Sequence, residues 1–183
     1  YNGVALQSGT SHFFGQKFSK AYDIKYLNRE NKLDYPYQTS WGVSTRMMGA
    51  LIMVHSDDYG LVLPPRIAPN KVVIIPISND LEVMSMANDY LDKLKKEGIE
   101  AYIDDSEKSP GYKFAEAEVL GIPVRIEIGK RDLENNVITL VRRDTREKRE
   151  VFTNTDIVHD VKILLEDIQR DMYDRALRRR EEM

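Results

Sequence analysis

The amino-acid sequence predicts an α/β fold in which a mixed sheet follows an aromatic N-terminal part and precedes a long C-terminal helix. Composition changes near Pro69, strand-like and helix-like segments alternate after that point, and the last residues carry apolar side chains at helical spacing. Alternation of strands with helices is typical of α/β sheets. We therefore expect domains at residues 1–69 and 70–154, and a helix at residues 155–183.

The N-terminal part is rich in aromatic residues and glycine, and prolines mark its end. Leu61–Pro69 reads LVLPPRIAP, which we expect to be a short strand, since proline continues neither a helix nor a central strand. The apolar run Met47–Val54 predicts a buried helix. Its methionines are assigned to the core: Met47, Met48 and Met53.

A strand and a helix are expected directly after the prolines. Lys71–Ile77 (KVVIIPI) is almost continuously apolar, as a strand buried on both faces would be. Ser78–Gly98 predicts a helix with Ser78 as its N-cap and Gly98 as its C-cap. The side chains expected to face the core are Met84, Ala87, Leu91 and Leu94.

The alternation continues to residue 153. The expected elements are a strand at Ile99–Asp104, a break at Pro110–Gly111, a short helix at 113–120, a strand at Ile122–Gly129, a turn at Asn135–Asn136 and strands at 137–144 and 150–153. This order indicates a mostly parallel sheet with one antiparallel hairpin at its edge.

The last segment predicts a long amphipathic helix. Apolar side chains at helical spacing run from Ile157 to Met172, and the charged sequence ALRRREEM follows them. We expect this helix to lead out of the domain.

Composition limits the chemistry of the chain. The 183 residues contain no cysteine, so neither a disulfide nor a thiolate zinc site forms within them, in keeping with a reducing cytoplasm. His12, His55 and His159 lack metal-ligand spacing, and no metal site is expected. The longest apolar run is too short to cross a membrane, which needs about 20 residues. A net charge of −3 favours local, shaped RNA binding over a nonspecific basic coat.

The segment Tyr35–Pro69 carries the pattern of a nucleotide site. A Gly-Val-Ser-Thr turn leads into Arg46, whose planar guanidinium can bind a phosphate bidentately or stack on a purine. This stretch resembles motif 3 of the class II aminoacyl-tRNA synthetases. Thr45 stands where many members of that class have glutamate. Threonine at this position is a feature of the prolyl-tRNA synthetase family, which this stretch resembles.

An upstream segment adds further candidates for the same site. LQSGTSHFFGQ resembles a loop and strand of this family, and the resemblance assigns Gln7 and Thr10 to ATP and His12 to proline. An amide and a hydroxyl offer neutral, directional hydrogen bonds to a nucleotide. By the same resemblance, Trp41, Gly42 and Ser44 complete the proline pocket as an aromatic wall, a close-approach position and a hydroxyl.

The region from Ser109 to Lys148 resembles the anticodon-binding domain of the class IIa synthetases. Single-stranded bases are recognised by stacking on aromatic side chains and by hydrogen bonds to their edges. The residues that the resemblance assigns to the anticodon are Phe114, Glu118 and Arg125, with Arg143 and Lys148 as weaker candidates. Charge runs such as Arg142–Arg149 are otherwise solvent-exposed faces.

The two resemblances together imply the end of a class II antiparallel-sheet catalytic domain, then a mixed-sheet α/β anticodon-binding domain and a C-terminal helix. They imply activation of L-proline with ATP and Mg²⁺, transfer to tRNA(Pro), a homodimer and a cytoplasmic location. Motifs 1 and 2 of the class are not found in the sequence, so we expect the chain to begin inside the catalytic domain and to be inactive alone.

Other interpretations remain open. The chain could be a catalytically inactive tRNA-binding or accessory module, or a nucleotide-binding regulator that reuses the fold. Without the family resemblance, His12 would be a structural histidine and Trp41 a core residue. Asp57 and Asp58 are interpreted as a turn rather than as a metal pair.

Overall fold

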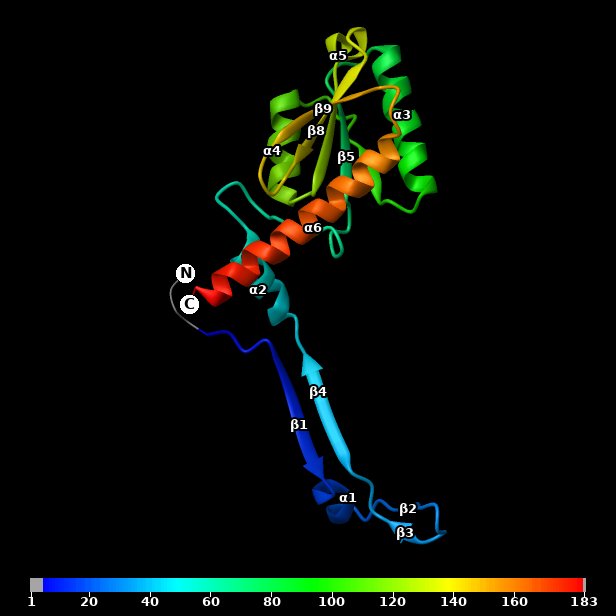
Figure 1. Ribbon diagram of the computed structural model, residues 1–183, viewed down its shortest axis with the longest axis vertical. Coiled ribbons are helices and arrows are strands. Elements are labelled where there is room, and N and C mark those ends of the chain that lie inside the picture. The colour runs from blue at the N-terminus through cyan, green and yellow to red at the C-terminus, as the bar shows by residue number, and fades with distance from the viewer. Residues whose placement is uncertain (1–4, 183) are drawn as a thin grey trace. The chain divides into compact units, whose positions relative to one another are not determined.

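The chain forms two compact units, residues 1–53 and 54–183, in a computed structural model that describes residues 5–182 (Figure 1). The division lies before the expected boundary at Pro69. The reason is that the segment after Asp57 is hydrogen-bonded to the end of α4 (Pro110–Leu120) and the residue after it, within the second unit: the Leu61 N–H donates to the Val119 carbonyl at 3.1 Å, and the Leu63 N–H donates to the Gly121 carbonyl at 3.4 Å. Leu61–Pro69 forms no strand, so that prediction is wrong.

The first unit is built on an antiparallel ribbon. Strand β1 (Gly9–Gly15) pairs with β4 (Gln38–Val43), and the short strands β2 (Tyr26–Leu27) and β3 (Leu33–Asp34) pair with each other. Helix α1 (Lys17–Ala21) follows β1, and α2 (Arg46–His55) follows β4. The antiparallel pairing agrees with the expectation for this part of the chain.

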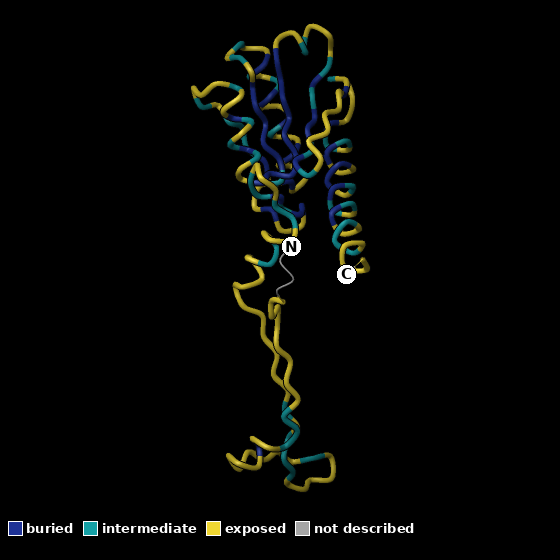
Figure 2. Tube along the Cα trace, turned by 90° about the vertical axis from the view of Figure 1, so that its left-hand side faces the viewer, coloured by how far each residue is buried: buried dark blue, intermediate teal, exposed yellow. Residues whose placement is uncertain are grey.

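The core assigned to α2 is not observed. Helix α2 has no buried residue, and Met47, Met48 and Met53 are 40%, 67% and 67% exposed. Figure 2 shows β1 and β4 mostly in the colour of exposed residues. An apolar run in the sequence identifies an apolar helix but does not identify the element that packs against it. A two-stranded ribbon offers little surface for such packing.

The second unit contains a mixed five-stranded sheet, as predicted. Its order is β6 (Ala101–Ile103), β5 (Val72–Pro76), β7 (Val124–Ile128), β8 (Val137–Arg142) and β9 (Lys148–Phe152). β5 pairs in parallel with β6 and β7, whereas β8 pairs antiparallel with β7 and β9. The sheet is thus half antiparallel rather than mostly parallel, because the connection after β7 is too short to cross over the sheet.

Helices cover both faces of this sheet. α3 (Leu81–Lys96) and α6 (Ile157–Glu181) pack on one face, where they form the larger core with Ile74, Ile126 and Leu140. α4 (Pro110–Leu120) packs on the other face against Val73 and Ile75, and Figure 1 shows α3 and α4 on opposite sides of the strands. All five residues of β7 are buried, so the side chains that alternate along this strand face protein on both sides of the sheet, and neither side faces solvent.

Several helix ends differ from the prediction. Asp80, not Ser78, is the N-cap of α3, and Glu97 is its C-cap, followed by Gly98 with φ of 72°. Pro110 does not break the chain but begins α4 after Ser109, since the first helical turn tolerates a residue without an N–H. The short helix α5 (Lys130–Glu134) was not predicted. The buried face of α3 consists of Val83, Ala87, Tyr90 and Leu94. Leu91 is half-buried and packs against the same core as predicted, whereas Met84 does not.

The first part of α6 belongs to the core and does not lead out of the domain. Asp156 caps the helix by accepting from the N–H groups of Val158 and His159. The buried residues run from Ile157 to Met172. Among residues 5–182, no helix is long and apolar enough to span a lipid bilayer.

Candidate functional site

A hollow of about 360 Å³ in the first unit collects most of the residues assigned to ATP and proline. Its lining residues come from the segment before β1, from β1, from the end of β4 and from the start of α2. They are Gln7, Ser8, Gly9, Thr10, Gly42, Val43, Ser44 and Arg46.

Arg46 organises the polar side chains of this hollow. Its NH1 atom donates to the Gln7 side-chain oxygen at 3.3 Å and to the Gln7 carbonyl at 3.4 Å, and the Gln7 amide donates to Thr10 Oγ1 at 3.2 Å. The Arg46 backbone N–H lies 3.4 Å from Ser44 Oγ. These bonds are long and solvent-exposed, so a ligand with phosphate and hydroxyl groups could replace them at low cost.

The strand register separates Trp41 from the other proline candidates. Thr10 lies opposite Gly42, and Ser11 lies opposite Trp41. Since neighbouring residues of a strand point to opposite faces, Gly42 and His12 share one face of the ribbon while Trp41 occupies the other, where it is 79% exposed. The ribbon therefore does not bring Trp41 and His12 to one pocket. Trp41 and His12 could line one pocket only if the pairing register of β1 and β4 changed.

A second polar cluster lies on the face of the other sheet that α4 covers. Arg125 on β7 is only 7% exposed. Its guanidinium carbon lies 4.5 Å from the centroid of the Phe114 ring, and its NH1 atom lies 3.4 Å from both Glu118 Oε1 and the Phe114 carbonyl. The structure thus brings together Phe114, Glu118 and Arg125, as the resemblance predicts.

Two further residues complete this cluster. Glu127, two positions after Arg125 on β7, accepts from Arg125 Nε at 2.9 Å and from Lys148 Nζ at 3.2 Å. Lys148 on β9 also lies 5.8 Å from the Phe114 ring centroid. Glu127 was missed by the sequence analysis, although its i+2 spacing from Arg125 places both residues on one face of the strand.

Arg143 lines the same small hollow as Glu118 and Arg125 but is held by different partners. It binds Asp57 with both terminal nitrogens, at 2.9 and 2.6 Å, and its Nε donates to the Glu118 carbonyl at 2.9 Å. The guanidinium lowers the pKa of Asp57 from its ordinary 3.8 to about 2. With Arg143 only 4% exposed, its donors bind the protein in this structure and are not presented to RNA.

Asp57 and Asp58 form a turn, as predicted, with a backbone bridge between Asp57 and Gly60. Within residues 5–182, no group of three or more histidine, cysteine, aspartate or glutamate side chains is placed to hold a metal ion.

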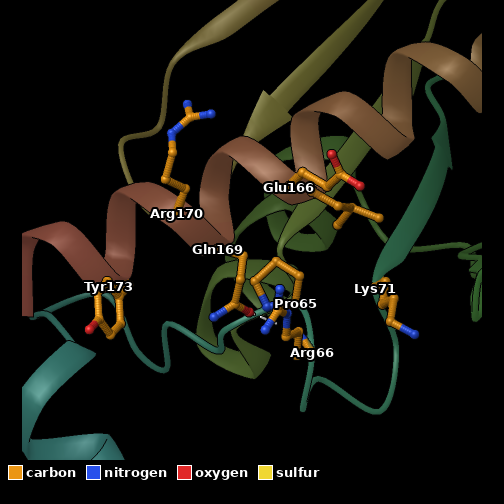
Figure 3. Close-up of a pocket in the computed structure, with 8 residues that line it drawn as sticks. Pro65, Arg66, Lys71, Glu166, Gln169, Arg170 and Tyr173 are labelled. Atoms are coloured by element: carbon orange, nitrogen blue, oxygen red, sulfur yellow. Dashed lines mark hydrogen bonds between the residues drawn. The ribbon is translucent and has the colours of Figure 1, made fainter.

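A larger hollow, of about 710 Å³, lies between the segment after Pro64 and α6 in the second unit (Figure 3). It contains none of the predicted site residues. Gln169 accepts the Arg66 backbone N–H at 3.1 Å, Lys71 pairs with Glu100, and Arg170 pairs with Asp167. The side chains of Lys71, Gln169 and Arg170 therefore already have partners within the protein.

Comparison with known proteins identifies the family. A family model described as "Anticodon binding domain" matches residues 71–158. The chain is 53% identical to the proline–tRNA ligase of Chlorobium chlorochromatii over 184 residues, and 52% identical to that of Bacteroides fragilis over 180 residues. The chain belongs to the prolyl-tRNA synthetase family. The match to the Chlorobium relative covers 99% of this chain and 38% of the relative, so the chain spans well under half of such a prolyl-tRNA synthetase.

A solved structure agrees with this assignment. The chain matches the crystal structure of prolyl-tRNA synthetase from Cryptosporidium parvum, complexed with L-proline and AMP, with a TM-score of 0.91 and 38% identity. The match covers 98% of this chain and 39% of that one. It confirms the predicted fold class, and the two relatives compared above are aminoacyl-tRNA ligases.

Proposed function

We propose that this chain is part of an enzyme that activates proline with ATP and transfers it to the 3′ end of tRNA(Pro). The observation that carries the proposal is 52 to 53% identity to proline–tRNA ligases across nearly the whole chain. The enzyme would work as a cytoplasmic homodimer whose dimer contacts lie in parts of the family outside this match.

In this proposal the first unit supplies part of the catalytic site. Arg46 binds ATP together with Gln7 and Thr10 and stabilises the negative charge that develops at the α-phosphate. His12, Gly42 and Ser44 hold proline on the same face of the ribbon, and Trp41 remains a candidate only if it can reach them. None of the described residues that line the hollow carries a carboxylate, so a magnesium ion would be held mainly by the phosphates of ATP.

The reaction needs no covalent bond to this chain. A carboxylate oxygen of proline attacks the α-phosphorus of ATP, and the bond to the departing pyrophosphate breaks. A hydroxyl of the terminal tRNA ribose then attacks the prolyl carbonyl, and AMP leaves. The protein contributes mainly by holding the reacting groups in line.

The second unit reads the anticodon in this proposal. Arg125 NH1 is a donor that lies 3.4 Å from the Glu118 carboxylate, which is an acceptor. Guanine presents O6 as an acceptor beside the donors N1–H and N2–H, so the two protein groups complement its Watson–Crick edge. Adenine presents the reverse order at the same edge. Phe114 provides the aromatic surface for stacking.

Proline-dependent exchange between ATP and pyrophosphate in a full-length enzyme that contains this chain tests the catalytic part. Arg46→Ala should slow exchange by about 100-fold, because one charge contact made in the transition state is lost. Affinity for tRNA should stay unchanged. Arg66→Ala, which removes an exposed arginine of the second unit, is the matched control. Equal loss of tRNA affinity in Arg46→Ala would contradict the assignment.

The chain as given should bind RNA without catalysing exchange, because motifs 1 and 2 are not in its sequence. An exchange rate equal to that of a full-length relative would overturn this expectation. If a full-length enzyme also failed to exchange yet bound tRNA, the alternative of an inactive tRNA-binding module would replace the enzyme.

A pair of anticodon stem-loops tests the RNA part. One carries the guanines of the prolyl anticodons and the other has them replaced. Glu118→Gln should weaken binding of the first by about tenfold and hardly affect the second. Glu116→Gln, on the same helix and paired with Lys108, is the control. Equal affinity of the unmodified chain for both RNAs would refute anticodon reading.

A further inference from the structure

Glu127 is a buried carboxylate in the middle of the cluster proposed to read RNA, and neither the resemblance nor the proposed function gives it a role. It lies on β7 and is 6% exposed. Burial of a charged group is costly unless ion pairs and hydrogen bonds compensate it. The partners of Glu127 are Arg125 and Lys148.

The contacts of Arg125 are unequal in a way that indicates what Glu127 does. Both Nε and NH2 of Arg125 lie 2.9 Å from Glu127 Oε1, which is a normal charge-assisted distance. Its NH1 atom has only contacts of 3.4 Å, near the limit for a hydrogen bond. One edge of the guanidinium is therefore fixed, and the opposite end is held only by long contacts.

A guanidinium is planar, so fixing one edge and one face fixes the direction of the whole group. Glu127 holds the edge, and the Phe114 ring lies against the face at 4.5 Å. NH1 is thereby aimed at the carboxylate of Glu118, which is 21% exposed and accessible to a base.

The four charges of the cluster also balance. Arg125 and Lys148 offset Glu118 and Glu127, so the cluster has little net attraction for phosphate. Lys148 keeps most of its exposure, at 57%, but its ammonium group is directed to Glu127. This pairing with a carboxylate leaves the ammonium group less available to a phosphate.

We propose that Glu127 is a positioning residue for anticodon reading, which holds the Arg125 guanidinium so that NH1 stands beside Glu118, while Lys148 holds Glu127. This inference rests on the proposed function. Removal of the Glu127 charge frees the guanidinium to rotate and leaves the cluster positive. The expected signature is loss of discrimination between bases, without a general loss of RNA binding.

The test measures the affinity of the full chain for the two anticodon stem-loops, in Glu127→Gln and in a matched control. Glu150→Gln is that control: Glu150 lies in the same cross-strand row through Thr139, is exposed and changes the net charge equally. We expect Glu127→Gln to reduce the preference for the guanine-containing RNA by about five- to tenfold, as expected for loss of one preorganised side chain. Glu150→Gln should keep the preference.

Affinity for the guanine-free RNA should be unchanged or higher in Glu127→Gln, because the variant is more positive. A structural lesion would instead weaken both RNAs alike, and that result would overturn the inference. An unchanged preference in Glu127→Gln would overturn it as well, while leaving the proposed function standing. If the unmodified chain showed no preference at all, the proposed function itself would fail.

An RNA-free measurement separates positioning from folding. The Arg125 Nε–H should exchange slowly with solvent in the NMR spectrum of the unmodified chain and faster in Glu127→Gln, with the backbone spectrum preserved. Lys148→Arg should keep the base preference, and Lys148→Met should lower it. Equal exchange rates in the two proteins would show that Glu127 does not hold Arg125.

Discussion

The ion pair between Asp57 and Arg143 allows the stability of the second unit to be predicted as a function of pH. Arg143 binds both oxygens of Asp57 and also the carbonyl of Glu118, near the end of α4. The Asp57→Asn variant removes the charge of the carboxylate and keeps its shape. Arg143→Met removes all of these bonds and keeps much of the apolar stem.

The size of the effect follows from the pKa of Asp57, which falls from 3.8 to about 2. At about 1.4 kcal/mol per pH unit, that shift corresponds to about 2.5 kcal/mol. The Asp57 side chain is 37% exposed, so solvent screening reduces the expected loss in Asp57→Asn to about 1–1.5 kcal/mol. Arg143→Met should cost about 2–3 kcal/mol, because it also releases the Glu118 carbonyl.

The sign of the pH dependence follows from the direction of the shift. A carboxyl whose pKa is lowered on folding stabilises the folded state above its unfolded pKa, and this stabilisation is lost as pH falls through the folded pKa. The difference between the unmodified chain and Asp57→Asn should therefore be full at pH 7 and should shrink between about pH 4 and pH 2.

Urea unfolding followed by circular dichroism measures these free energies. The sole tryptophan, Trp41, reports on the first unit by fluorescence and serves as an internal control. The double variant should be more stable than the sum of the single changes predicts, by about 1 kcal/mol. Strict additivity, or a difference that persists unchanged at pH 2, would refute the ion pair as the cause.

Three further outcomes follow from individual contacts. Gly60→Ala should destabilise the second unit by about 1–3 kcal/mol in urea unfolding, because an added Cβ would lie 2.5 Å from the Val119 Cα and φ is 137°. Asp144→Asn should cost about 3 kcal/mol in the same assay, since its side chain is fully buried and accepts two bonds from Arg142. His55 should titrate below pH 6.5 by NMR, because burial and then two arginines of α6 lower its pKa. Its protonation should therefore destabilise the folded chain as pH falls.

Matched changes distinguish these effects from general sensitivity to substitution. Gly111→Ala should be neutral or stabilising, since nothing lies within 4 Å of an added Cβ and alanine favours a helix. Asp105→Asn changes an exposed carboxylate and should leave stability within about 0.5 kcal/mol. If Gly111→Ala destabilised the chain as much as Gly60→Ala, or Asp105→Asn as much as Asp144→Asn, the structural reasons given would be contradicted. A titration midpoint of His55 above pH 6.5 would contradict the effect assigned to its burial.

Periodicity was sufficient to predict the second unit but not its details. The strand and helix order emerged from runs such as Lys71–Ile77 and from the amphipathic spacing of α6. Helix α5 was missed because its five residues are too few to show a period. The mixture of parallel and antiparallel pairings depends on connection lengths, and the short connection between β7 and β8 forces an antiparallel pair.

The candidate sites show a different limit. The family resemblance assigned Gln7, Thr10 and Arg46 to the same ligand, ATP. The structure places these three residues around one hollow, whereas binding of ATP there stays a prediction. The same resemblance assigned Trp41 and Gly42 to one pocket, yet neighbouring residues of a strand face apart. Glu127 went unnoticed since a glutamate in a strand is ordinarily assigned to solvent, and only the sheet places it under α4.

The buried residues of the second unit's two cores all come from the segment between Val62 and Met172. The residues around Arg46 contribute nothing to those cores, so thermal melting of the second unit should be insensitive to changes there. Under the proposed function, chemistry on the amino acid and recognition of RNA would then be able to change separately in evolution. A laboratory could likewise graft the second unit, as the proposed RNA-binding part, onto another carrier without rebuilding its interior.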